Sequence, residues 1–93
     1  MKRIYTVTTI RDLEGGGCRV IGYFFRRYGA VDAVLENAGD MYECGHYPYA
    51  VIEGVCEGIH PHTTEVWFMW DKDGYKEIPK PDKVKNICNW GIG

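Results

Sequence analysis

The sequence predicts an α+β protein in which one antiparallel β-sheet of about five strands carries a single helix packed on one face, in the order β-β-α-β-β-β. Runs rich in β-branched and aromatic residues recur along the chain, and these residue types favour strands. One segment instead has apolar residues at spacings of three and four, the period of an amphipathic helix. Because the sequence shows no second helical pattern, we expect the sheet to cover this helix.

Short turns join the expected strands. Three consecutive glycines at 15–17 favour a hairpin loop between the first two strands. Asp71–Gly74 contains an Asp-Gly turn, which favours a hairpin between the last two. The third strand alternates poorly between polar and apolar residues, as in a central strand packed on both faces or a strand at a dimer edge. The expected strands are Ile4–Ile10, Cys18–Phe25, Tyr49–Val55, Val66–Trp70 and Tyr75–Ile78, with Val84–Ile92 as a closing segment and candidate sixth strand.

The helix is expected from about Gly29 to Gly39. Asp32 falls in its first turn, where a carboxylate interacts favourably with the helix dipole. Gly39 and Asp40 lie where the helix should end. The apolar stripe consists of Ala30, Val31, Val34, Leu35, Ala38 and Met41.

The composition is that of one globular domain covering residues 1–93, with 45% hydrophobic and 26% charged residues. Eleven Lys and Arg against thirteen Asp and Glu give a net charge of −2. General nucleic-acid binding depends on a basic surface, so we expect none. The longest charge-free run, Cys44–Ile52, contains nine residues. A membrane-spanning helix needs about 20 apolar residues, so we expect no membrane association.

The start of the chain lacks the pattern of a secretory signal, because the apolar stretch Ile4–Ile10 is short and contains three threonines. We therefore expect a cytoplasmic protein, in the cytosol of the host cell. There the four cysteines should be thiols.

Two pairs of potential metal ligands stand out: Cys44 with His46, and His60 with His62. Residues two apart in an extended chain point to the same side, so four such ligands could surround a zinc ion. The spacing differs from the usual zinc patterns, and two surface loops that contain histidine explain it as well. We expect no metal site and no cofactor.

Cys44 and His46 are also the one local pair suited to a cysteine nucleophile, and the chain contains no serine. The other cysteines, Cys18, Cys56 and Cys88, lie in strand-like runs, where a thiol is usually a small buried apolar group. The sequence therefore predicts no catalytic residues and no enzyme, with a small Cys/His-dependent enzyme kept as an alternative.

Arg26, Arg27 and Tyr28 lie at the junction of a strand and the helix. Free backbone N–H groups and the positive end of the helix dipole favour anions there, and two guanidinium groups can bind phosphate. The alternative is a solvated turn in which these arginines pair with Asp32 or Glu36.

Aromatic residues are abundant: seven Tyr, three Trp and three Phe. Trp67, Phe68 and Trp70 lie within four residues of one strand, so they must point to both faces of the sheet. The helix covers one face, and the other must meet a ligand, a second subunit or water. Since the Trp67–Trp70 strand and the apolar end 86–93 exceed what one short helix can cover, we expect a homo-oligomer.

Five stretches resemble small uncharacterised proteins encoded by phages and prophages of Gram-positive and gut bacteria. They are RVIGYF at Arg19–Phe24, AVLENAGDMYE at Ala33–Glu43, YAVIEGV at Tyr49–Val55, WFMWD at Trp67–Asp71 and NWGIG at Asn89–Gly93. The resemblance implies a protein that counters host defence. Some such proteins sequester nucleotide immune signals such as cyclic dinucleotides or cyclic ADP-ribose isomers, and others block a defence protein, as anti-CRISPR proteins do.

From these observations we expect a phage-encoded protein that binds and sequesters a small nucleotide-derived immune signal without cleaving it. Cations for phosphate and flat rings for the base are what such a ligand requires. The expected ligand-binding residues are Arg26, Arg27, Tyr28, Tyr47 and Trp70. A protein-binding inhibitor of a host defence complex is the main alternative, because it would use the aromatic residues equally well.

Overall fold

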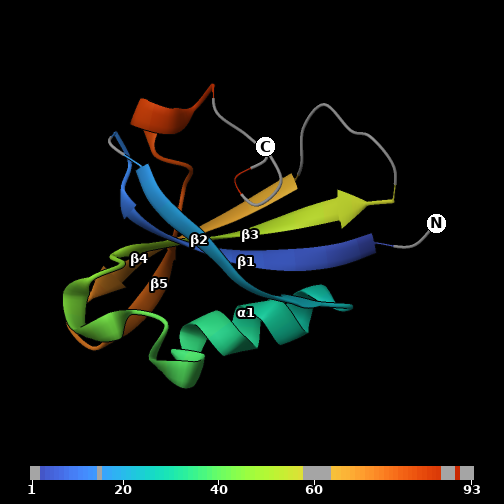
Figure 1. The fold of residues 1–93 in the computed structure, drawn as a ribbon, viewed down its shortest axis with the longest axis horizontal. Helices are drawn as coiled ribbons and strands as arrows, with labels where there is room; N and C mark the ends of the chain where they lie inside the picture. The colour runs from blue at the N-terminus through green and yellow to red at the C-terminus, as the bar shows by residue number, and fades with distance from the viewer. Residues whose placement is uncertain (1–2, 15, 58–63, 87–89, 91–93) are drawn as a thin grey trace.

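The computed structural model of the protein describes residues 3–14, 16–57, 64–86 and 90. Its five strands form one antiparallel sheet in the order β2-β1-β3-β4-β5 (Figure 1). The strands are β1 (Arg3–Asp12), β2 (Gly16–Phe24), β3 (Tyr49–Cys56), β4 (Thr64–Asp71) and β5 (Gly74–Ile78). The helix α1 (Arg27–Leu35) follows β2, and the short 3-10 helices are η1 (Ala38–Asp40), η2 (Glu43–Gly45) and η3 (Asp82–Val84). An α+β protein with one antiparallel five-stranded sheet is thus confirmed.

The two faces of the sheet carry separate apolar clusters. On one face α1 packs across the strands, below the sheet in Figure 1. The buried residues of this cluster are Val7, Ala30, Val34, Met41, Ala50, Ile52, Phe68 and Tyr75. On the other face, where η3 lies, the buried cluster consists of Ile10, Val51, Trp67 and Val84, with Trp90 packed against it.

The helix begins and ends earlier than the sequence predicts. It starts at Arg27, so Asp32 lies beyond the first turn, which contains no acidic residue. It ends at Leu35, because Asn37 takes a left-handed backbone conformation with φ 51°. Met41 of the expected stripe still joins the core, but from the segment after η1.

The third strand is central, which confirms the first of the two interpretations. Five of its eight residues are buried, and the exceptions are its two ends and Gly54. The closing segment differs from the expectation. Residues 82–86 form η3 and a turn, so no strand begins at Val84. The proline at 81 has the extended conformation that precedes this turn. Cys88 and Ile92 of the expected closing face lie outside the described residues.

Within the described part of the chain, no helix is both long and apolar enough to cross a membrane.

Candidate functional site

The first turn of α1 has no side-chain cap. Its N-cap residue is Arg26, which has an extended backbone (φ −126°, ψ 138°) and makes no capping hydrogen bond. Ser, Thr, Asp and Asn are the usual residues here, because their side-chain oxygens accept a hydrogen bond from the first free N–H groups. The start of α1 therefore presents backbone donors and the positive end of the helix dipole with no acidic side chain of its own helix in the first turn.

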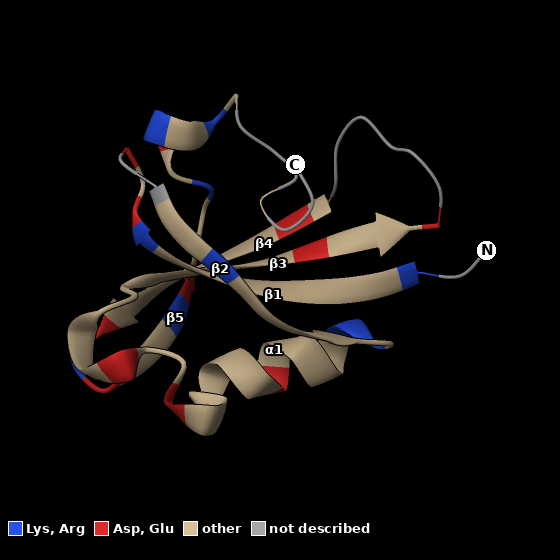
Figure 2. Ribbon diagram, viewed as in Figure 1, with Lys and Arg blue, Asp and Glu red and all other residues tan. Residues whose placement is uncertain are grey.

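Arg26 and Arg27 add two positive charges at this point. Both are exposed, and the start of α1 is blue in Figure 2, beside the end of β2. Across the residues that the structure describes, neither arginine makes an ion pair, so the alternative pairing with Asp32 or Glu36 is not formed. The next residue, Tyr28, is 65% exposed. Three of the five expected ligand-binding residues thus lie together and face solvent.

Two further exposed aromatic residues directly precede this group along the chain and were not among the expected site residues. Phe25 is 75% exposed and Tyr23 is 59% exposed. Their rings meet edge to face, with centroids 5.7 Å apart. The sequence signal was the alternation of side chains along the strand, which places residues 23 and 25 on one side and the core residue Phe24 on the other.

Tyr47 and Trp70, the other two expected residues, lie elsewhere. Tyr47 belongs to the segment that leads from the end of α1 to β3, and Trp70 lies in β4. The backbone N–H of Trp70 donates to the carbonyl of Pro48 in this segment, at 2.8 Å. The nine residues of α1 rise about 1.5 Å each, so roughly 13 Å of helix separates Arg27 from this segment. The structure does not bring these two rings together with the arginines.

Both rings already have partners within the chain. Trp70 stacks on Tyr42 and meets the ring edge of Tyr75. The guanidinium of Arg19 lies 5.1 Å from the ring centroid of Tyr47, and the hydroxyl of Tyr75 donates to the carbonyl of Tyr47 at 2.6 Å. Burial, with smaller contributions from Tyr42 and Asp40, raises the pKa of Tyr75. These rings form part of the packed core edge rather than an open stacking surface.

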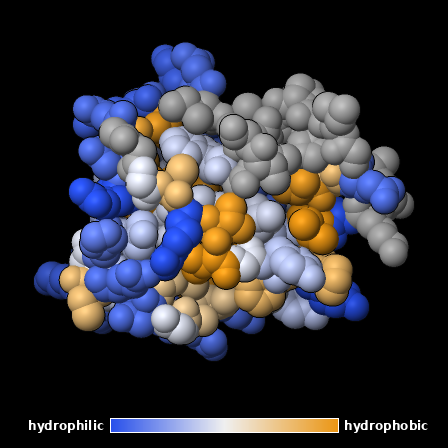
Figure 3. Space-filling model, viewed as in Figure 1, coloured by the Kyte–Doolittle hydropathy of each residue, from blue (hydrophilic) through white to orange (hydrophobic). Residues whose placement is uncertain are grey.

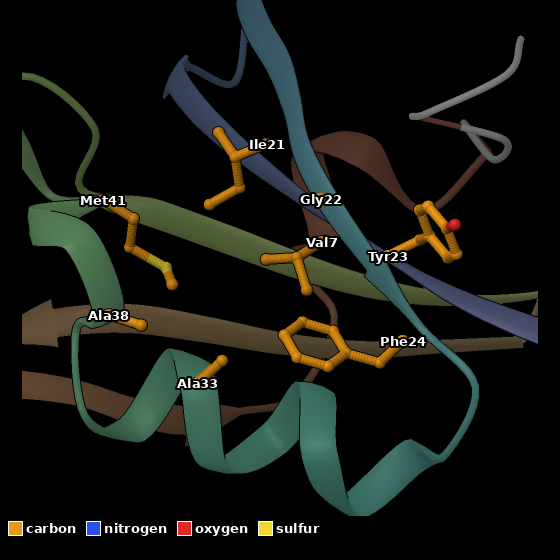
Figure 4. Close-up of a pocket in the computed structure, with 8 residues that line it drawn as sticks. All are labelled: Val7, Ile21, Gly22, Tyr23, Phe24, Ala33, Ala38 and Met41. Carbon is orange, nitrogen blue, oxygen red and sulfur yellow. The ribbon is translucent and has the colours of Figure 1, made fainter.

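A groove runs between β2 and the end of α1 (Figure 4). It holds a cavity of about 150 Å³. Phe24 and Met41 point into it above Ala33, whereas the ring of Tyr23 points away. Pockets for drug-sized ligands occupy about 300–1,000 Å³, so this apolar cavity has room only for a small group.

A more polar hollow of about 390 Å³ adjoins the groove and shares Ile21, Ala38 and Met41 with it. Its charged residues are Arg19, Asp40 and Glu43. Arg19 forms an ion pair with Glu43, which leaves the carboxylate of Asp40 as the excess charge among these three. A phosphate-bearing ligand is disfavoured at a hollow with this balance.

The expected metal and nucleophile candidates are only partly described. Cys44 and His46 are both exposed, and His60 and His62 lie outside the described residues. The sulfur of Cys44 lies 4.0 Å from Oδ2 of Asp40, and the ring of His46 meets that of Tyr47. Among the residues described, no group of three or more His, Cys, Asp or Glu side chains could hold a metal ion.

The cysteines differ from their expected burial. Cys18 is exposed and Cys56 is half-buried, and no disulfide involves them or Cys44. Cys18 is exposed because it lies on β2, an edge strand beyond which the described residues form no further strand. Cys88 is outside the described residues.

The surface on which we based the homo-oligomer is partly covered within the chain. Trp67 is buried against Val84 and meets Trp90 edge to face, with ring centroids 5.4 Å apart. The face of the sheet opposite α1 therefore needs no second subunit at Trp67. Of the apolar end 86–93, the structure describes only residues 86 and 90, so the rest of this surface lies outside the described residues.

In comparisons with family models, curated proteins and solved structures, nothing matches this chain.

Proposed function

We propose that the protein binds a small anionic, nucleotide-like molecule at the start of α1 and holds it without cleaving it. The observation that carries this proposal is the pair of exposed arginines at an uncapped helix start, neither of which has an ion pair among the described residues. A phosphate would accept hydrogen bonds from the guanidinium groups and from the free N–H groups of the first turn. It would thereby supply the cap that the sequence lacks.

Tyr28 provides the flat ring that a nucleobase requires. Its ring is largely exposed, and among the described residues no other ring stacks on it. Stacking on an aromatic side chain contributes about 1–3 kcal/mol per base. Sequestration of a nucleotide-derived immune signal, the role that the resemblance to phage proteins implies, is the biological function that fits this chemistry.

The test is calorimetry against a panel of cyclic dinucleotides and cyclic ADP-ribose isomers, with chromatography of the released ligand. In the double variant Arg26→Glu, Arg27→Glu we expect binding to be lost, since each phosphate contact contributes about 1.5–3 kcal/mol. The matched control is Arg11→Glu, Lys85→Glu, which changes the net charge equally at exposed positions away from α1. Exposed charges contribute little to stability, so both variants should remain folded.

The ring is tested separately. Tyr28→Ala should weaken binding and Tyr28→Phe should retain it, because the phenyl ring keeps the stacking surface. Recovery of a chemically altered molecule would make the protein an enzyme. Absence of binding across the panel would instead favour the protein-binding inhibitor.

A further inference from the structure

β2 is an edge strand of the sheet, and its outer side is open. Among the described residues no strand pairs with it beyond β1. Its nine residues contain one charge, that of Arg19. An exposed edge of this kind offers unpaired N–H and C=O groups to a further strand, and proteins usually protect such edges with charges, proline, β-bulges or short length.

The opposite edge, β5, shows this protection. It has five residues, of which Lys76 and Glu77 are charged, and Pro79 follows it. β2 is longer and apolar, and it carries Val20 and Tyr23, which are 44% and 59% exposed. Figure 3 shows a hydrophobic area over β2, next to hydrophilic side chains.

The pairing of β2 with β1 shows which side chains share a face. Tyr23 lies opposite Thr6, Val20 opposite Thr8 and Cys18 opposite Ile10. These three β1 residues alternate along the strand, so Cys18, Val20 and Tyr23 lie on one face. Ile21 is the extra residue of a β-bulge, because the register passes from Gly22 to Val20 as β1 passes from Val7 to Thr8.

We propose that a second copy of this chain pairs with β2 in antiparallel orientation, and that the two-fold axis passes between Ile21 and Gly22. Residues directly opposite each other in an antiparallel pair lie on the same face. In this register Val20 faces Tyr23 of the second copy, and each member of that pair lies on the face opposite α1. If the two β2 strands were shifted by one or two residues from this register, at least one residue of one sheet face would lie opposite a residue of the other sheet face. The reason is that the bulge interrupts the alternation of side chains along β2.

The same register is compatible with the charges. Arg19, the one charged residue of β2, faces Phe24 of the second copy, so the two Arg19 side chains do not lie opposite each other. The exposed apolar side chains of each copy are covered by the other. Because both copies use the same surface, the contact closes as a dimer and exposes no further edge at β2.

This dimer does not depend on the proposed ligand. In this register the residues that pair strand to strand are Arg19–Phe24, and Arg26 and Arg27 lie beyond the end of β2. Mass can therefore be measured without nucleotide, and failure of either proposal leaves the other testable.

The first test is the mass in solution by light scattering over a wide concentration range. We expect the mass to approach twice 10.7 kDa at high concentration. Val20→Lys should return it to that of one chain, because a charge at the edge opposes pairing. Leu35→Lys is the matched control, since Leu35 has a similar exposure, 49%, but lies on α1. The proposal is overturned if the mass stays that of one chain at every concentration, and the edge would then be open to a strand of another protein. It is also overturned if the two variants change the mass equally.

The second test is the register. With the four native cysteines changed to alanine, Val20→Cys and Tyr23→Cys are prepared as separate proteins. A disulfide needs Cα atoms about 4.4–6.8 Å apart, so a covalent dimer should form when the two are mixed and not in either alone. Val20→Cys mixed with Met69→Cys, an exposed position on β4, is the control. Equal cross-linking in the control mixture, or in either single variant, overturns this register.

Discussion

The rings of Tyr42 and Trp70 lie face to face, with centroids 3.8 Å apart and planes 5° from parallel. Tyr42 belongs to the segment after α1, and Trp70 is near the end of β4. The stack therefore fastens this segment to the sheet. It also occupies one of the two faces of the indole ring on which a nucleobase could stack.

We predict that this stack stabilises the fold through a direct interaction between the two rings. A double-mutant cycle with Tyr42→Leu and Trp70→Leu should give a coupling of about 0.5–1.5 kcal/mol, the range for aromatic pairs. Urea denaturation of the four proteins measures it. Additive effects of the two substitutions would show that the rings contribute by burial alone.

A second prediction concerns the end of α1. Asn37 has φ 51°, its Oδ1 accepts from the N–H of Tyr42 at 2.9 Å, and its Nδ2 donates to Asp40 at 3.2 Å. Asn37→Gly removes the two hydrogen bonds and keeps the backbone relaxed. Asn37→Ala adds the strain of a left-handed conformation, which costs roughly 1–2 kcal/mol. The free energy of unfolding should thus be lower for alanine than for glycine, and equal values would contradict this account.

Lys80 supports a third prediction. Its Nζ lies 2.9 Å from Oε2 of Glu65, whose Oε1 accepts from Nε1 of Trp67 at 2.8 Å. The side chain of Glu65 is nearly buried. Removing one partner of a buried ion pair costs about 3–5 kcal/mol, and because Lys80 is partly exposed we expect Lys80→Met to cost about 2–4 kcal/mol.

Lys83 is the matched control for this lysine. It pairs with Glu14 at 3.0 Å, and both side chains are exposed. An exposed pair contributes roughly 0–1 kcal/mol, so Lys83→Met should leave the midpoint of urea denaturation almost unchanged. Equal losses in the two variants would show that burial of Glu65 does not decide the cost.

The sequence predicts the strands well because their signals are local. β-branched and aromatic runs lie between glycine turns, and each of the five observed strands overlaps its expected range. The end of α1 was harder to predict. The apolar stripe continues through Ala38 and Met41, while the backbone of Asn37 already leaves the helical conformation. An apolar stripe indicates which side chains favour burial, as Met41 shows, but it does not show whether those residues have a helical backbone.

The candidate site was predictable only where it is local. Arg26, Arg27 and Tyr28 are consecutive, so any structure keeps them together. Tyr47 and Trp70 depend on tertiary packing, which gave them partners within the chain. The cover of Trp67 came from Val84 and Trp90, whose segment was predicted as a closing segment and candidate sixth strand.

The last prediction concerns alkaline pH. Burial raises the pKa of Tyr75, and its hydroxyl donates to the carbonyl of Tyr47 at 2.6 Å. A tyrosine in the unfolded chain ionises near about pH 10. Above this pH the unfolded state binds fewer protons than the folded state, so the contribution is fully present below about pH 10 and is lost as the pH rises. The free energy of unfolding falls by at most about 1.4 kcal/mol per pH unit from this group.

Urea denaturation at about pH 9 and about pH 11 should show this loss in the wild type and in Tyr23→Phe, an exposed control. The loss should be smaller in Tyr75→Phe. An unchanged loss in Tyr75→Phe would assign the alkaline destabilisation to other groups.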